Sequence, residues 1–346
     1  MSAVVRETGK GPTPTSALER RESLSFDMLL VSAVSAVILL GLVMVASSSI
    51  TIAAERGPAL TLFWRQFAYA IAASAVMLLI VRAPISLWRR LGPWLLLLGA
   101  GLLGAVLIPG VGREVNGSMR WLALGPVNMQ PSELVKIFSV LYLAGYLVRR
   151  NDHVRTRSSG FFKPIALMSL IALLLLAEPD YGATVVLFAT TLTMLFLGGV
   201  PFISFSIWVL AIVSVFALMM VAAPYRMERL LAFVNPWADP FGSGFQLTQA
   251  LIAIGRGEWF GVGLGQSVQK LHYLPEAHTD FLFAVLSEEL GLLGAGATIV
   301  LFAFITWRAF QIGHRALTAG QPYAGYLAYG IGLLIGLQAL FFEYVH

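Results

Sequence analysis

About nine apolar runs, each close to the length that crosses a bilayer, divide this chain. They cover roughly residues 28–50, 59–81, 92–109, 131–148, 164–177, 183–199, 202–222, 282–306 and 322–342. The fifth run is short, and polar residues 178–182 separate it from the sixth, so these two are expected to be a helix pair joined by a tight turn. The pattern predicts an all-α fold, a polytopic integral membrane helical bundle.

The composition excludes a soluble fold. Apolar residues make up 58% of the chain and charged residues only 12%, far below the roughly 25% of soluble domains. There is no cysteine, so a disulfide framework, a Cys-based metal site and a thiol nucleophile are excluded. The run 28–50 is too long for a signal-peptide core. Residues 1–27 are therefore expected to be an N-terminal tail, and 28–346 a single transmembrane domain.

Lysine and arginine are concentrated in alternate loops, which predicts the orientation in the membrane. One set of loops carries Arg82, Arg89, Arg90, Arg149, Arg150, Arg155, Arg157, Lys163, Arg308 and Arg315. The other loops, 51–58, 110–130 and 223–281, hold acidic and basic residues in near balance. The N-terminus is therefore expected to be cytoplasmic and the long loop 223–281, between the seventh and eighth spans, extracytoplasmic. The net charge of +5 reflects this bias and indicates membrane lipid, with no nucleic acid, as a partner.

The long loop is expected to fold rather than to act as a linker. It gathers the aromatic residues Trp237, Phe241, Phe245, Trp259, Phe260 and Tyr273, which are rare in disordered segments. Residues 246–254 predict a short amphipathic helix with Leu247, Leu251 and Ile254 near one face. The glycines of 255–265 favour tight turns. A phosphate-binding loop is the weaker interpretation, because no Lys-Ser/Thr follows and there is no Rossmann unit.

The end of this loop holds the densest group of titratable residues. In an extended segment Glu276, His278 and Asp280 would share one face. Asp280 would lie at the membrane interface, where desolvation raises the pKa of a carboxyl group towards the range of a general base. Two alternatives remain. Asp280 or Thr279 could cap the following helix, or His278 could join Glu276 or Asp280 in a metal site, although one histidine and loose carboxylates make a poor ligand set.

Further ionisable residues lie in or beside the apolar runs. Glu133 and Lys136 are three positions apart, hence on one helical face, after a Pro131 suited to a helix start. Such groups usually face a polar cavity or each other, so a functional role and an internal packing pair are both open. Glu288 and Glu289 raise the same question at the start of the eighth run.

Two arginines in the 110–130 loop are predicted on the same side of the membrane as Asp280. Arg113 and Arg120 could hold a pyrophosphate with their guanidinium groups, although surface solvation would explain them almost as well.

Several separated motifs resemble those of the SEDS family, the shape, elongation, division and sporulation proteins. The resemblance lies in 116–121, 130–136, 179–182, 235–237, 244–249, 255–265 and 273–281, and it extends from the first span to about Gln338. It is closer to the cell-division branch of the family than to the elongation branch. The family has about ten spans, whereas this chain shows about nine, so the last span and its Ser-Tyr-Gly-Gly pattern are expected to be missing.

The resemblance implies a peptidoglycan glycosyltransferase that polymerises lipid II into septal glycan strands during cell division. The family's catalytic aspartate stands in a Thr-Asp-Phe pattern, which here is Thr279-Asp280-Phe281. Asp280 is therefore expected to be the general base. The substrate-binding residues are expected to be Arg113, Arg120, Glu133, Lys136, Gln246, Gln249, Glu276, His278, Thr279 and Glu288. No metal ligand or cofactor is assigned, although a divalent cation such as Mg²⁺ or Mn²⁺ would suit a leaving pyrophosphate.

The resemblance also implies a location and partners. The protein is expected in the cell inner (cytoplasmic) membrane at the division septum. Its partners would be lipid II, which is an undecaprenyl-pyrophosphate-linked disaccharide peptide, a class B penicillin-binding protein transpeptidase of the FtsI type, and divisome proteins such as FtsQ, FtsL, FtsB and FtsN. A lipid II flippase and a non-catalytic division scaffold are the alternative functions.

The predicted orientation can be tested with reporter fusions. A reporter fused after Arg155 should report a cytoplasmic location, and one fused near Ser243 the opposite side, because lysine and arginine stay on the cytoplasmic side. The reverse pair of readings would contradict the orientation and, with it, the side on which the candidate site is placed.

Overall fold

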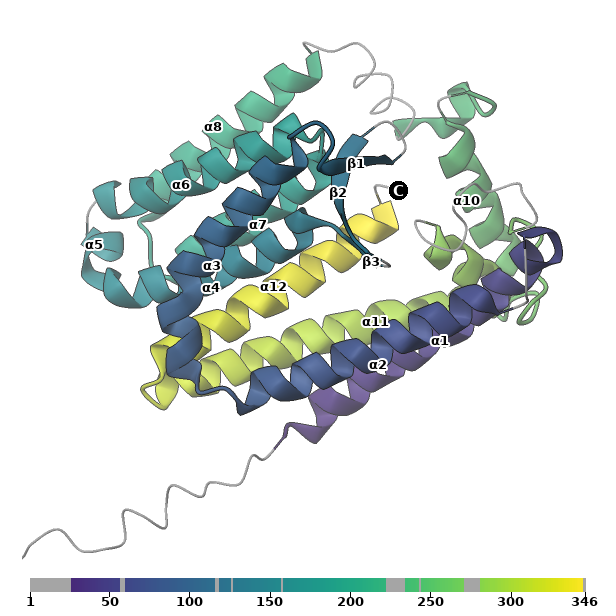
Figure 1. Cartoon of the computed structure of the whole chain (residues 1–346), viewed down its shortest axis with the longest axis horizontal. Coiled ribbons are helices and arrows are strands. Elements are labelled where there is room, and N and C mark those ends of the chain that lie inside the picture. The colour runs from purple at the N-terminus through teal and green to yellow at the C-terminus, as the bar shows by residue number, and fades with distance from the viewer. Residues whose placement is uncertain are drawn as a thin grey trace, which may run out of the picture.

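Long apolar helices run side by side through most of the molecule (Figure 1). The computed structural model describes residues 26–56, 60–115, 118–125, 127–156, 158–221, 234–242, 244–270 and 281–344. The long helices are α1 (Met28–Arg56), α2 (Thr61–Arg82), α3 (Ile85–Val106), α4 (Pro131–Arg149), α6 (Ser158–Ala177), α7 (Tyr181–Leu197), α8 (Phe202–Val221), α11 (Leu282–Thr318) and α12 (Pro322–Tyr344). Each falls on one of the apolar runs of the sequence.

The helices confirm a multi-pass membrane protein. Among the described residues, α1, α2, α4, α6, α11 and α12 are long and apolar enough to span a membrane, and α7 and α8 contain shorter apolar stretches. The expected pair of helices around residue 180 is present as α6 and α7. Four boundaries lie well outside the expected runs, since α1 continues to Arg56, α3 begins at Ile85, α6 begins at Ser158 and α11 continues to Thr318. Apolar runs miss such extensions because a helix can continue past the hydrocarbon region.

A small sheet at one end of the bundle was not expected. Strands β1 (Gly112–Val115), β2 (Ser118–Leu124) and β3 (Val127–Met129) pair antiparallel in the order β1-β2-β3. We call this the sheet end of the bundle. The α6–α7 turn and the short helices η2 (Pro236–Ala238) and α10 (Phe245–Gly257) also lie at this end, whereas the short helix α5 (Asn151–Thr156) lies at the opposite end (Figure 1).

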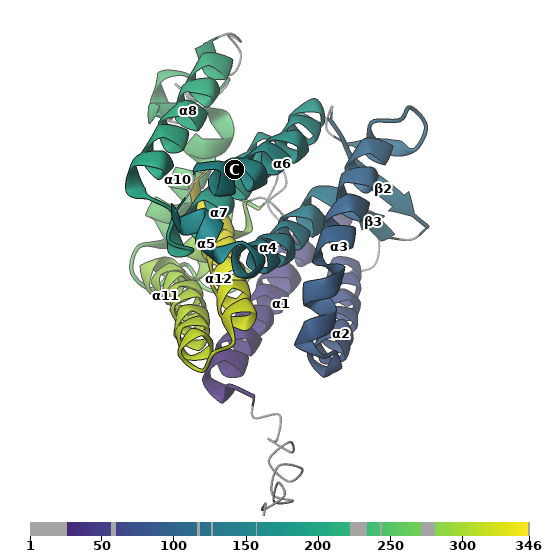
Figure 2. The ribbon, with the colours of Figure 1, turned by 90° about the vertical axis from the view of Figure 1, so that its left-hand side faces the viewer.

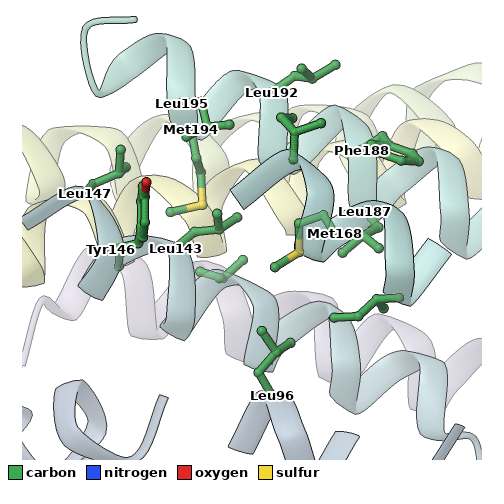
Figure 3. Close-up of a cluster of buried hydrophobic side chains, with 14 of the residues drawn as sticks. Leu96, Leu143, Tyr146, Leu147, Met168, Leu187, Phe188, Leu192, Met194 and Leu195 are labelled. Atoms are coloured by element: carbon green, nitrogen blue, oxygen red, sulfur yellow. The ribbon is translucent and has the colours of Figure 1, made fainter. Parts of the chain in front are cut away.

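The largest core lies among α4, α6 and α7. Figure 3 shows Leu143 and Leu147 of α4 with Leu187 and Leu195 of α7, and Met168 of α6 reaches the same cluster. Inside a bilayer such contacts stabilise by close packing rather than by exclusion of water. Helix α3 lies against α4 (Figure 2).

Small residues allow the close approach of α3 to α4. A Cβ atom on Gly92 would stand 3.1 Å from the carbonyl oxygen of Leu141, and one on Gly99 would stand 2.8 Å from the Val135 side chain. A larger side chain at either position would push the two helices apart.

Helix α11 is broken at Gly291, where the backbone turns to φ 68° and ψ −169°. In a continuous helix the amides of Leu292 and Leu293 would donate to the carbonyls four residues earlier. The loop after α10 replaces those bonds with four others: Leu292 N to Glu258 O at 2.8 Å, Leu293 N to Trp259 O at 3.2 Å, Val262 N to Glu288 O at 2.9 Å and Gly263 N to Glu289 O at 3.1 Å. Non-helical backbone at membrane depth requires such partners.

The glycines of this loop serve turns and close contact. Gly261, Gly263 and Gly265 have positive φ angles of 80°, 102° and 81°. A Cβ on Gly257 would collide with the carbonyl oxygen of Ser287 on α11. The turn interpretation is therefore confirmed for Gly261, Gly263 and Gly265, and it is wrong for Gly255 and Gly257, which belong to α10.

Alanine substitutions along α11 test the break. Gly291→Ala should lower the free energy of unfolding by at least about 2 kcal/mol, because the left-handed backbone is strained for alanine and its Cβ would meet the backbone of Trp259 at 2.6 Å. Gly296→Ala is the matched control on the same helix, since a Cβ there meets nothing within 4 Å. It should be neutral or stabilise by up to about 1 kcal/mol. Thermal unfolding in detergent measures both, and equal effects would contradict the break.

Candidate functional site

Two groups of polar side chains lie at the sheet end of the bundle. We call the first the α4–α7 cluster: Arg120, Gln130, Glu133, Lys136, Glu178, Asp180 and Gln338. We call the second the α11 cluster: Ser47, Arg256, Ser267, Lys270, Glu288 and Glu289. Polar side chains of this density in an apolar bundle are costly and usually serve a function.

Glu133 and Lys136 form an ion pair on the first turns of α4. The Lys136 Nζ atom lies 2.8 Å from Glu133 Oε1, and the side chains are 5% and 51% exposed respectively. Pro131 occupies the first turn, as expected. Gln338 of α12 donates to the second Glu133 oxygen at 3.0 Å. The pair thus links two helices while the Glu133 carboxylate stays accessible, so the packing and functional interpretations both have support.

Arg120 of β2 is held by main-chain oxygens. Its Nε atom donates to the carbonyl of Glu178 at 3.2 Å, and Nη2 donates to the carbonyl of Pro179 at 2.6 Å. Neutral acceptors hold this guanidinium in place without cancelling its charge, so it can attract an anion. Arg113, by contrast, is exposed on β1, and its contact to Asn128 at 3.5 Å is at the limit of a hydrogen bond.

The turn beneath Arg120 buries a carboxyl group. Glu178 is 1% exposed, and neither of its side-chain oxygens has a hydrogen-bond partner among the described residues. Burial, reinforced by the charge of Asp180 and opposed by Arg120, raises the pKa of Glu178 to about 8. Asp180 caps α7 by accepting from Ala183 N at 3.1 Å and also accepts from Gln130 at 3.2 Å.

Glu288 binds the loop that follows α10. Its carboxylate is fully buried and lies 3.0 Å from the Arg256 guanidinium. It also accepts from the Ser267 hydroxyl and from the amides of Val268 and Gln269 at 3.1 and 3.4 Å. This carboxylate is thus saturated by protein donors, which makes it a structural anchor and argues against the direct contact with substrate that the sequence suggested.

Glu289 binds the same loop and also α1. Lys270 Nζ lies 2.7 Å from Glu289 Oε1, with side chains 2% and 0% exposed. The Ser47 hydroxyl lies 2.8 and 2.6 Å from the two Glu289 oxygens. Two charges buried this deeply are tolerated because they satisfy each other.

The helix predicted at 246–254 is present as α10, but the face that it buries is not the one that carries Leu251 and Ile254. Thr248, Ala250 and Ala253 are buried, while Leu251 and Ile254 are each 40% exposed. The buried face carries small side chains because α10 approaches the α11 backbone closely, as the contact of Gly257 with Ser287 shows. Of the two expected substrate-binding glutamines, Gln246 is exposed and Gln249 half-buried.

The residues expected around the general base, Glu276, His278, Thr279 and Asp280, lie outside the described residues. Their roles stay predictions. The first described residue after them, Phe281, is the N-cap of α11 and has no side-chain cap. Within the described residues no three acidic or histidine side chains gather as metal ligands.

Comparisons with known proteins identify the family. Residues 27–343 match the model described as "Cell cycle protein", which represents FtsW, RodA and SpoVE. The chain belongs to this family.

Relatives and solved structures agree with this family. The chain is 54% identical over 314 residues to "Probable peptidoglycan glycosyltransferase FtsW" of Nitrosococcus halophilus, covering 90% of this chain and 81% of that protein. It is 50% identical to the protein of the same description from Halorhodospira halophila, covering 91% and 80%.

Two solved structures share the fold. One chain comes from "Structural coordination of polymerization and crosslinking by a peptidoglycan synthase complex", with a TM-score of 0.71, 25% identity and coverage of 92% and 87%. The other is the rod shape determining protein RodA of Thermus thermophilus, with a TM-score of 0.63, 25% identity and coverage of 92% and 84%.

In this member of the FtsW/RodA/SpoVE family, sequence reasoning missed eight polar residues of the two clusters. They are Ser47, Gln130, Glu178, Asp180, Arg256, Ser267, Lys270 and Gln338. The available signal was Glu178 and Asp180 on either side of a proline between two spans. Two acidic residues so near the bilayer must be neutralised, capped or paired.

Glu178 predicts a dependence of stability on pH. The pKa of Glu178 is higher in the folded than in the unfolded state. Its contribution to the free energy of unfolding is therefore complete below its ordinary pKa of 4.5 and is lost as the pH rises towards about 8. The wild type should lose roughly 1.4 kcal/mol per pH unit over this range from this group. Glu178→Gln should remove that loss, while the exposed control Glu114→Gln should keep it. Thermal unfolding between pH 5 and 8 measures this dependence. If the stability of the wild type and of Glu178→Gln changes with pH in the same way, Glu178 is not a buried neutral carboxyl group.

Proposed function

We propose that this protein is a peptidoglycan glycosyltransferase of the FtsW type that polymerises lipid II into septal glycan strands. The observation that carries the proposal is the α4–α7 cluster at the sheet end of a multi-pass bundle, in a chain 54% identical to a protein described as a glycosyltransferase of this kind. The cluster supplies cationic groups for an anionic headgroup beside helices that can accommodate a lipid tail.

The leaving group explains the arginine and lysine residues. Glycosyl transfer from lipid II releases undecaprenyl pyrophosphate, so negative charge grows on the pyrophosphate as the glycosidic bond breaks. Arg120 is positioned by two carbonyls and keeps its charge for that anion. Lys136 lies on the neighbouring α4, where substrate can compete with Glu133 for its ammonium group. Arg113 is exposed on β1 and suits an outer contact.

Asp280 is the proposed general base. Its carboxylate would take the proton from the 4-hydroxyl of the acceptor sugar, and that oxygen would form a bond to the anomeric carbon of the donor glycan. The bond from that carbon to pyrophosphate then breaks, and its electron pair leaves with undecaprenyl pyrophosphate. A base in hydrogen-bond reach of the hydroxyl is required. Gln246 and Gln249 on α10, and Glu276, His278 and Thr279 beside Asp280 in sequence, are proposed to bind the glycan.

The proposed setting is the cytoplasmic membrane at the division septum, with the N-terminus cytoplasmic. The sheet end would then face outward, where glycan strands are made. A class B penicillin-binding protein transpeptidase of the FtsI type is the proposed partner, supported by the similarity to a chain of a peptidoglycan synthase complex. FtsQ, FtsL, FtsB and FtsN are proposed as further divisome partners.

The break in α11 is a feature that a flippase could use, since transporters often carry broken helices. Here the loop after α10 fills the break with four main-chain hydrogen bonds. A transport path would require these bonds to open, which favours glycosyl transfer over lipid movement.

Two substitutions at Asp280 separate a base from a helix cap. Asp280→Asn is nearly isosteric and caps equally well but cannot accept a proton, so it should lower glycan synthesis by about 10²- to 10⁴-fold and leave folding intact. Asp280→Ala should be as inactive and, if the side chain also caps α11, less stable by about 1 kcal/mol. Polymerisation of lipid II by purified protein with its transpeptidase partner measures activity, and thermal unfolding measures stability.

The same assay decides between the functions. Near-normal glycan synthesis by folded Asp280→Asn would exclude the base role. If the wild type moves lipid II across vesicles yet extends no glycan with its partner present, the flippase is correct. If it does neither while binding the partner, the scaffold is correct.

A further inference from the structure

Two neighbouring carboxylates, Glu288 and Glu289, attach one loop to α11 through both their main chains and their side chains. Their carbonyl oxygens accept from Val262 and Gly263. Their carboxylates accept hydrogen bonds from a second stretch of the same loop, residues 267–270. These two side chains belong to the α11 cluster defined above, which also contains Ser47, Arg256, Ser267 and Lys270. Because the cluster attaches the loop, we also call it the carboxylate clasp.

The clasp joins three separate parts of the chain. Ser47 comes from α1, Lys270 from the loop and Glu289 from α11, and all three are buried. The Lys270 ammonium group also donates to the carbonyl and hydroxyl oxygens of Ser47 at 3.3 Å each. The Ser47 hydroxyl in turn accepts from the amide of Gly265 at 3.2 Å. Lys270 can therefore not shift without breaking bonds to two helices.

The clasp closes a ring around the residue proposed as the general base. Lys270 and Glu289 are 19 positions apart in sequence, and their ion pair closes the chain between them. Asp280 lies within this ring and directly precedes Phe281, the N-cap of α11. Lys270 and Phe281, the described residues that flank 271–280 in the sequence, are thus both attached to α11. Closing a loop of this length removes many of the conformations that the stretch could adopt.

A purely stabilising role does not explain a charged clasp. Burying an ion pair costs desolvation that its attraction often fails to recover, and apolar residues of equal size frequently stabilise more. A buried ion pair fixes the relative orientation of the segments that carry it, because its partners must meet at fixed distances and angles. A general base must lie at hydrogen-bond distance from its hydroxyl, about 2.6–3.2 Å between the heavy atoms, and small displacements from that position slow the reaction, so a fixed orientation is what the loop before Asp280 needs.

We propose that Glu289, Lys270 and Ser47, supported by Glu288, are positioning residues that hold the Asp280 segment in its reactive place. The inference rests on the proposed function in assigning the reaction to Asp280. These residues touch no reacting atom in this scheme. They act through the loop, and their loss should change turnover rather than substrate affinity.

Paired substitutions test the clasp without leaving a lone buried charge. Lys270→Met with Glu289→Met keeps the volume and removes the ion pair, so the protein should fold. Its kcat for lipid II polymerisation should drop about tenfold or more with KM nearly unchanged. The exchanged pair, Lys270→Glu with Glu289→Lys, restores the attraction and should recover kcat to within about threefold of wild type. Ser47→Ala keeps both charges, and it should lower kcat about two- to fivefold.

A second readout does not depend on activity. The chain has no cysteine, so Ala277→Cys and Val300→Cys would be its only thiols and can carry a pair of spin labels. Val300 is exposed on α11 and gives a fixed reference point. The distribution of distances between the labels should broaden in the Met–Met and Ser47→Ala backgrounds, and the exchanged pair should narrow it again.

The two readouts separate this inference from the proposed function. Broader distances with lower kcat and unchanged KM support the clasp. Wild-type kcat in a folded Met–Met protein, or an unchanged distance distribution, overturns it while leaving the glycosyltransferase assignment intact. If both paired variants fail to fold, Ser47→Ala decides alone, and wild-type values in both of its readouts overturn the clasp. Absence of glycan synthesis by the wild type defeats the proposed function, whereas the distance measurement still judges the clasp.

Discussion

Main-chain hydrogen bonding is the constraint on which this structure depends. Inside a bilayer no water replaces a lost bond, so a helix can break only where protein supplies new partners. At Gly291 the missing partners come from residues 258–263, which both donate to and accept from the broken turn of α11. The long loop is therefore part of the bundle, and its glycines, its path and its attachment to α11 follow from that requirement.

The two polar clusters divide the work of the proposed reaction. In the α4–α7 cluster, Arg120 is held by neutral carbonyls and keeps its charge for an anionic substrate, and the Glu133 carboxylate that pairs with Lys136 is half exposed. In the α11 cluster the charges of Lys270 and Glu289 are buried and mutually satisfied. The first arrangement suits binding and the second suits positioning, because an exposed charge can exchange partners and a buried pair cannot do so without a large desolvation cost.

Local features were predictable from the sequence, and contacts between distant residues were not. The apolar runs predicted the helices because length and hydropathy are local, and the spacing of Glu133 and Lys136 predicted their shared face. The break at Gly291 escaped prediction because a glycine in an apolar run usually continues a helix. Ser47 and Lys270 were missed for another reason, because their partner Glu289 lies far from them in the sequence. The residues around Asp280 lie outside the described structure, so the proposed base still rests on resemblance.

Hydrogen–deuterium exchange measures most directly whether the loop and α11 form one unit. Peptides that cover 258–265 and 289–293 should be recorded for the protein in lipid nanodiscs. The account predicts that the amides of Val262, Gly263, Leu292 and Leu293 exchange as slowly as those of the α11 helix, because each of them donates to a main-chain carbonyl across the break. Rapid exchange at Val262 and Gly263, together with slow exchange in the rest of α11, would show that the loop is not bound to the break and would contradict the account.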